Sequence, residues 1–137
     1  MKNITKEKIW EMFETAEKAM KFSNVKPAKS AFGAAILGGS GKVYGGCSFD
    51  GCPMDYCAER VALLKALSEG EKKIEAILVS YQGTFRDLKK IGGTCGVCLN
   101  ALYQLGGKNL KLPMYVWPTG EENFQKTTLG KLYPEPF

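Results

Sequence analysis

Two short cysteine motifs constrain this chain more than any other feature of its sequence. The first reads Cys57-Ala58-Glu59-Arg60 and the second reads Cys95-Gly96-Val97-Cys98. Three cysteines fit a catalytic zinc site, because such a metal usually takes three protein ligands and leaves one position open for water. Glu59 is too close in sequence to Cys57 to ligate comfortably, but it is well placed to hold that water. Since the chain contains no histidine, any zinc must be bound by thiolates or carboxylates.

Both motifs are predicted to lie where helices begin. The predicted helices span residues 56–68 after a capping Asp55, and residues 95–105 after a capping Thr94. Free backbone N–H groups and the helix dipole at such positions favour thiolate over thiol. Residues three apart share one helix face, so Cys95 and Cys98 are expected to point the same way.

The remaining periodicity predicts an α/β domain with the element order α-ββ-α-β-α-β-β. Apolar residues at helical spacing predict one amphipathic helix over residues 4–22. The strands are predicted over residues 30–37, 42–47, 74–81, 112–117 and 124–128. Residues 74–81 form a nearly unbroken apolar run, which is typical of a sheet covered on both faces.

Composition agrees with one soluble globular unit, and residues 1–137 are expected to form a single domain. The chain has 137 residues, of which 45% are hydrophobic and 24% charged, which is ordinary for such a domain. No apolar run is long enough for a membrane span, and the first residues show no hydrophobic region of a secretory signal. The 5 cysteines, three of them at metal-ligand spacing, favour a reducing compartment such as the cytoplasm.

The net charge of +5 raises the alternative of a nucleic-acid surface. The lysines are dispersed, however, and acidic residues alternate with them, as in Lys6-Glu7-Lys8. This pattern favours a solvated surface over a phosphate-binding face, so we expect no nucleic-acid partner.

Together, the two motifs resemble those of the zinc-dependent cytidine deaminase family. Its signature is a His or Cys followed by x-Glu, then Pro-Cys-x-x-Cys, and the first motif here is similar to the all-cysteine branch that acts on free nucleosides. Gly33-Ala34-Ala35 is similar to a family strand, and residues 129–137 resemble the family's C-terminal tail. The resemblance runs from about residue 4 to the last residue. It implies a three-layer domain, with a five-stranded mixed sheet and helices on both faces.

The resemblance also implies how the site works. One Zn²⁺ per chain would be held by Cys57, Cys95 and Cys98, and Glu59 would move protons during hydrolytic loss of ammonia from the base. Arg60 can donate hydrogen bonds to the sulfurs, which offsets the net negative charge of zinc with three thiolates.

Substrate contacts are implied at further positions. Backbone groups at Ala58 and Gly93 would bind the polar edge of the base. Ser48 and Asp50 stand where the family has Asn and Glu, whose side chains hold the ribose 3′-hydroxyl. The free-nucleoside branch is tetrameric, and its C-terminal phenylalanine stacks on the base in a neighbour's pocket; Phe137 takes that place here.

Departures from the family pattern concern the substrate. Thr94 replaces the motif proline, and the loop between Asp50 and Cys57 is shorter than usual, as in the blasticidin S deaminases. The aromatic residue that stacks on the base aligns with Ser30. Phe32 lies two residues further on the same strand face and can substitute for it, although a core phenylalanine is an equally good interpretation.

Four function classes follow from these observations. The first is deamination of free cytidine or deoxycytidine to uridine or deoxyuridine. The second is deamination of a modified nucleoside, a related base or a nucleoside antibiotic, which the changed sugar motif favours. A polynucleotide deaminase is disfavoured by the short chain without a basic tail. A non-catalytic zinc module would need a fourth ligand, for which Cys47 and Cys52 are candidates, and it would have no use for Glu59.

Overall fold

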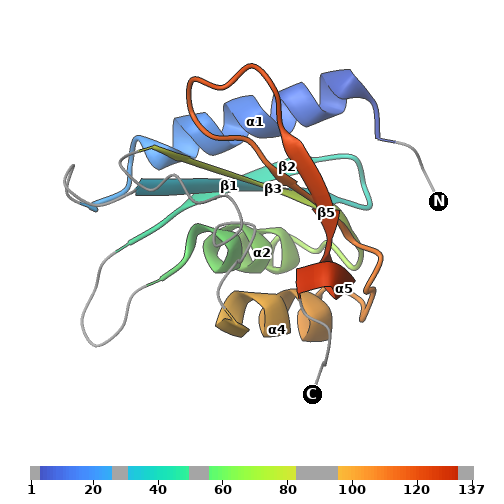
Figure 1. Ribbon diagram of the computed structural model, residues 1–137. Helices are drawn as coiled ribbons and strands as arrows, with labels where there is room; N and C mark the ends of the chain where they lie inside the picture. Colours follow the sequence, from blue (N-terminus) through green and yellow to red (C-terminus); the bar gives the residue numbers. More distant parts are fainter. Residues whose placement is uncertain (1–3, 26–30, 50–55, 83–95, 133–137) are drawn as a thin grey trace.

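The computed structural model describes residues 4–25, 31–49, 56–82 and 96–132. These residues form a five-stranded sheet and helices that follow the predicted element order (Figure 1). In chain order, the elements are α1 Lys6–Met20, β1 Ala31–Gly38, β2 Val43–Cys47, α2 Ala58–Ser68, β3 Ile74–Gln82, α4 Gly96–Leu105, β4 Pro113–Val116, β5 Gln125–Thr128 and α5 Leu129–Leu132. The short helix α5 is the one described element that the sequence pattern did not indicate.

The sheet is mixed, as predicted, with the strand order β2-β1-β3-β4-β5. Strand β1 pairs antiparallel with both β2 and β3. Strands β3 and β4 are parallel, because α4 lies between them in the chain as a crossover, and β5 returns antiparallel to β4. The expected three-layer α/β arrangement is confirmed: α1 covers one face of the sheet, and α2 and α4 cover the other (Figure 1).

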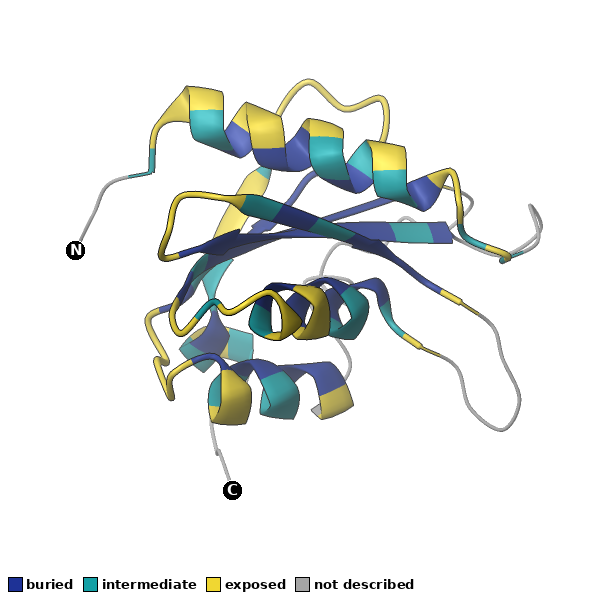
Figure 2. Cartoon of the chain, turned by 180° about the vertical axis from the view of Figure 1, so that it is seen from behind, coloured by how far each residue is buried: buried dark blue, intermediate teal, exposed yellow. Residues whose placement is uncertain are grey.

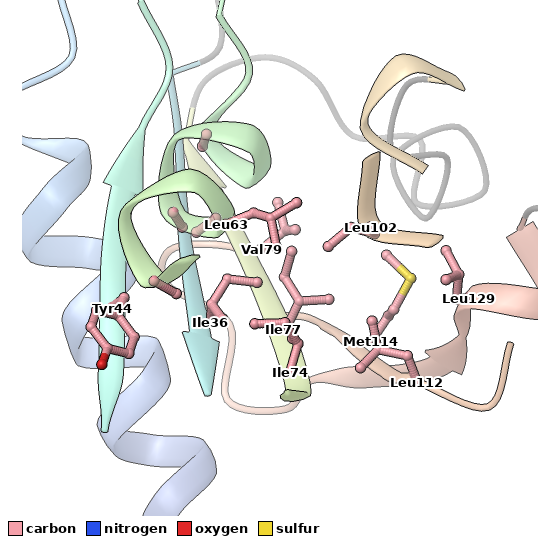
Figure 3. Packing of buried hydrophobic residues seen from close by; sticks show 14 of the residues in the cluster. Ile36, Tyr44, Leu63, Ile74, Ile77, Val79, Leu102, Leu112, Met114 and Leu129 are labelled. Carbon is pink, nitrogen blue, oxygen red and sulfur yellow. The ribbon is translucent and has the colours of Figure 1, made fainter. Parts of the chain in front are cut away.

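Two apolar cores lie on the two faces of the sheet. On the α1 face, Met12 and Ala16 of the helix pack with Ala35 and Leu78 of the strands. On the opposite face, alternate strand residues such as Ile36, Ile77 and Val79 pack with Leu63 of α2 and Leu102 of α4 (Figure 3). The helix α1 is buried only along the side that faces the sheet (Figure 2). Burial on both faces explains the unbroken apolar run of β3.

Glycines allow the helix backbones to approach the sheet closely. A Cβ added at Gly46 of β2 would lie 2.5 Å from the backbone N of Ala62 and 3.0 Å from the carbonyl O of Ala58, both in α2. A Cβ at Gly33 of β1 would overlap the carbonyl of Ala16 in α1. The backbone of α2 therefore rests directly on β2 at Gly46, without an intervening layer of side chains.

A carboxylate ties the turn between β1 and β2 to the segment that follows α2. Glu71 accepts hydrogen bonds from the hydroxyl of Ser40 and from the phenol of Tyr44, the latter at 2.6 Å. These contacts, with Ser40 the larger influence, hold the pKa of Glu71 below its usual value. The segment after α2 is thereby held against the beginning of β2, where Tyr44 lies.

The predicted beginning of the second helix was wrong. That helix was expected to begin at Tyr56, but α2 begins at Ala58 with Cys57 as its N-cap. Tyr56 instead forms an antiparallel bridge with Phe49, with backbone N to O distances of 2.8 and 2.9 Å. An extended residue with both backbone groups used in a bridge cannot start a helix. The proposed caps Asp55 and Thr94 lie outside the described residues.

Among the residues described, no helix has both the length and the apolar character needed to cross a membrane.

Candidate active site

The first cysteine motif lies at the N-terminus of α2. Cys57 has extended backbone angles, φ −77° and ψ 145°, which continue the conformation imposed by the Phe49–Tyr56 bridge. Ala58 and Glu59 follow in the first turn and are both buried. The positive end of a helix dipole is therefore directed at this segment, and it stabilises negative charge there.

Glu59 is the most deeply buried carboxylate among the described residues, with 6% of its surface exposed. Burying a carboxylate costs free energy unless hydrogen bonds or an opposite charge compensate it. Buried ionisable groups are frequent at functional sites. Glu59 lies in the first turn of α2, two residues after Cys57, and its role in proton transfer stays a prediction.

Arg60 connects the two cysteine motifs. Its Nη2 donates to the Sγ of Cys57 across 3.9 Å. Burial by itself would lower the pKa of Arg60, but hydrogen bonds to Cys57 and Cys98 and the charges of both sulfurs outweigh it, so that the pKa is raised. The sulfurs of Cys57 and Cys98 therefore face the same guanidinium group, although they come from different helices.

Cys98 reaches this place from α4. The residue is fully buried, and α4 packs beside α2 on the same face of the sheet (Figure 1). The third predicted ligand, Cys95, lies outside the described residues, as does Gly93. Within the described part of the chain, no cluster of three or more potential metal ligands occurs, so the structure brings together two of the three predicted ligands.

Cys47 lies on the other face of the sheet. It pairs with Gly33 of β1, whose position contacts Ala16 and Met20 of α1. Burial raises the pKa of the Cys47 thiol, which favours the neutral form. Cys47 is therefore a core residue of the α1 face and not a fourth ligand, whereas Cys52 lies outside the described residues.

The donor set fits a zinc ion. Two sulfurs at or beside helix N-termini, a guanidinium that compensates thiolate charge, and a buried carboxylate form a site suited to a thiolate-bound metal. A structural site closed by four cysteines would need a further thiol, and the described Cys47 is directed away. Among the described residues, Cys47 is therefore excluded as a further ligand of this site.

The predicted substrate contacts are placed only in part. Phe32 is half-buried on the α2 face of β1, 5.8 Å from Tyr81 between ring centroids. Ser48 is buried just after β2. Asp50, Phe137 and Ser30 lie outside the described residues. Two neighbours of these positions were not predicted: Tyr81 lies beside Phe32, and Ser23 lies beside Ser48.

Comparison with known proteins assigns the chain to a family. The family model for the cytidine and deoxycytidylate deaminase zinc-binding region matches residues 6–114, which include both cysteine motifs. The cytidine deaminase of Sporosarcina psychrophila is 30% identical over 124 residues, covering 89% of this chain and 85% of that protein. The cytidine deaminase of Halalkalibacterium halodurans is 28% identical over 92% of this chain and 91% of its own.

The fold is shared with solved structures as well. The crystal structure of cytidine deaminase from Burkholderia pseudomallei superposes with a TM-score of 0.79 at 26% sequence identity, covering 98% of this chain and 100% of that one. The cytidine deaminase from Mycobacterium tuberculosis superposes with a TM-score of 0.69 at 22% identity, covering 94% and 96% of the two chains, which shows a common fold.

Proposed function

Because the chain belongs to the cytidine and deoxycytidylate deaminase family, we propose that it deaminates free cytidine or deoxycytidine, giving uridine or deoxyuridine and ammonia. It is a zinc-dependent hydrolase of that family. The observation that carries the proposal is the start of α2, where Cys57 and Glu59 lie beside the guanidinium that also meets Cys98. Residues 1–137 would act as a single domain.

The predicted site residues have separate tasks in this proposal. A zinc ion held by Cys57, Cys95 and Cys98 would supply the Lewis acid that makes water acidic near neutral pH. Glu59 would accept the proton of the attacking water and return protons to the ring nitrogen and the leaving amine, so that ammonia departs. Arg60 would withdraw charge from the thiolates, and the backbone at Ala58 and Gly93 would orient the base.

The positions around the sugar and the base remain predictions. Ser48 and Asp50 are the predicted neighbours of the sugar, and Phe32 or Phe137 would stack on the base. Phe32 supports this role by its half-buried position on the α2 face beside Tyr81. The altered sugar motif keeps a second candidate open, in which the substrate is a modified nucleoside, a related base or a nucleoside antibiotic.

A substrate panel tests the proposal directly. We expect ammonia release from cytidine and deoxycytidine, in a sample that holds one zinc per chain by metal analysis. Blasticidin S, free cytosine and single-stranded DNA form the other arms of the panel. Activity confined to one of those arms would replace the proposed substrate, and a folded, reduced sample with far less than one zinc per chain would contradict the metal site.

The oligomeric state is a further part of the proposal. Large apolar side chains on the outer surface of α2 and α4 are strongly exposed, namely Leu64 at 51%, Val97 at 61% and Leu105 at 48%. Exposed apolar groups on adjacent elements usually mark an interface. We therefore propose a homotetramer in which Phe137 of one chain completes the pocket of a neighbour.

Removal of Phe137 tests the shared pocket. A chain that ends at Pro136 is expected to keep its zinc and its tetrameric mass in light scattering, but to show a raised KM, because an aromatic surface against the base is lost. The full-length protein is the control in both measurements. A monomeric full-length protein, or unchanged kinetics after truncation, would show that the tail does not complete a neighbour's site.

The cellular setting is proposed from the same chemistry. Thiolate ligands need a reducing compartment to stay available, so we propose a cytoplasmic enzyme. Because the proposed substrates are free nucleosides, we also propose a role in pyrimidine salvage. No nucleic-acid partner is proposed, because the lysines are dispersed along the sequence and alternate with acidic residues.

A further inference from the structure

Strand β2 ends where the carbonyl of Ser48 leaves the sheet. The N–H of Ser48 still donates to the carbonyl of Phe32 in β1, at 3.0 Å. The return bond of this pair uses the side chain: the N–H of Phe32 donates to the hydroxyl oxygen of Ser48, at 3.1 Å. The carbonyl of Ser48 instead accepts from the hydroxyl of Ser23, at 2.5 Å, in the segment after α1.

The protons of the two hydroxyls can be assigned. The single proton of Ser23 is committed to the carbonyl of Ser48. The two hydroxyl oxygens are 3.2 Å apart, so the proton between them must come from Ser48. Ser23 also accepts from the N–H of Val25, at 3.2 Å. Ser48 therefore has already given away its only proton, and it keeps at most one lone pair for any ligand.

The contact between the Ser23 and Ser48 hydroxyls lies directly before the segment that leads to α2. The residue after Ser48 is Phe49, whose backbone forms the two-bond bridge with Tyr56. Tyr56 in turn precedes Cys57, the N-cap of α2. Fixing the end of β2 thus fixes the first turn of α2 across a short covalent and hydrogen-bonded path.

We propose that Ser48 is a positioning residue, which together with Ser23 fixes the Phe49–Tyr56 bridge and the start of α2, and which donates no hydrogen bond to the sugar. The proposal rests on the proposed deaminase function. It changes the role that the family resemblance gave to this position, because an asparagine amide can donate to a sugar hydroxyl and this serine cannot. The consequence is a site in which Ser48 donates no hydrogen bond to the 3′-hydroxyl.

Two substrates separate the roles of Ser48. A residue that holds the 3′-hydroxyl affects cytidine but not 3′-deoxycytidine, whereas a positioning residue affects both. We expect Ser48→Ala to lower kcat for both substrates by roughly threefold to tenfold, the equivalent of one hydrogen bond. The ratio of their kcat/KM values is expected to stay within about twofold of the wild-type ratio. A loss confined to cytidine, or a rise in KM for cytidine alone, would overturn the proposal.

Substitution of Ser23, which contacts Ser48, is the second test. Ser23→Ala is expected to reproduce most of the loss, and Ser23→Ala combined with Ser48→Ala to add little, because both variants break one network. Ser48→Thr, which keeps the hydroxyl, is expected to restore activity. Full additivity, or an inactive Ser48→Ala beside an unaffected Ser23→Ala, would contradict the shared network.

Ser80→Ala is the matched control. Ser80 is a fully buried serine, and its hydroxyl has no hydrogen-bond partner in the described part of the chain. Its removal is expected to leave kinetics and stability unchanged. If the wild-type protein deaminates neither cytidine nor 3′-deoxycytidine, the proposed function fails. The network is then still tested by urea unfolding of the same variants, where a lack of coupling between Ser23 and Ser48 would overturn it.

Discussion

Replacing Glu59 by glutamine is expected to abolish most turnover while leaving zinc and fold in place. The amide keeps the shape of the buried side chain but can no longer accept the proton of water. A general acid–base group typically contributes about 10²–10⁴-fold in rate, and one group that serves several proton transfers can contribute more. The kcat of Glu59→Gln for cytidine is therefore expected to fall by a factor of at least about 10².

Metal analysis and kinetics on the same sample distinguish the possible roles of Glu59. Glu69→Gln is the matched control, because Glu69 lies on the exposed far end of the same helix and should tolerate the change. Near-normal turnover of Glu59→Gln would rule out proton transfer by this carboxylate. Loss of zinc from Glu59→Gln would instead identify Glu59 as a ligand.

Gly46→Ala is expected to damage stability and chemistry together. The added Cβ would lie 2.5 Å from the N of Ala62 and 3.0 Å from the O of Ala58, and both are backbone atoms of α2. Backbone atoms cannot rotate away as a flexible side chain does, so the helix must shift. Overpacking of this kind costs about 1–3 kcal/mol in the free energy of unfolding, and a shift of α2 moves Cys57 and Glu59 with it.

Urea unfolding and kcat of the zinc-loaded variant measure both effects. Gly39→Ala is the control, because the Cβ added there first meets the Cβ of Lys73 at 3.2 Å and no backbone atom of α2. Gly39 lies in the β1–β2 turn, which contacts the segment after α2 and not the first turn that carries Cys57 and Glu59. We expect Gly39→Ala to keep wild-type kcat. A Gly46→Ala protein with wild-type stability and activity would show that α2 is not seated on β2 as described.

The fold was largely predictable because its signals are local. Helical spacing gave α1, and the long apolar run gave a central strand buried on both faces. The beginning of α2 was not predictable, because the Phe49–Tyr56 bridge that keeps Tyr56 extended joins residues across a loop. The short helix α5 has only four residues, Leu129–Leu132, which is too few for periodicity to register.

The candidate site was predictable to the extent that spacing encodes it. Cys57, Glu59 and Arg60 are neighbours in the sequence, so their proximity needed no tertiary information. Two facts depended on the sheet instead. Cys47 is directed to the α1 face because of its pairing with Gly33. The hydroxyl oxygen of Ser48 lies 3.2 Å from that of Ser23, a residue from a segment with no motif.

The direct contact between the backbone of α2 and Gly46 also limits which positions can change when the substrate preference of this enzyme changes. A helix that rests on a strand without side chains between them has no adjustable spacer, so substitutions cannot gradually retune the distance between its catalytic turn and the sheet. Evolutionary change in substrate preference is then directed to the segments around that turn, where side chains can vary independently. The same division guides engineering: libraries that alter the substrate should leave Gly46, Ala58 and Ala62 untouched and sample the positions facing the sugar.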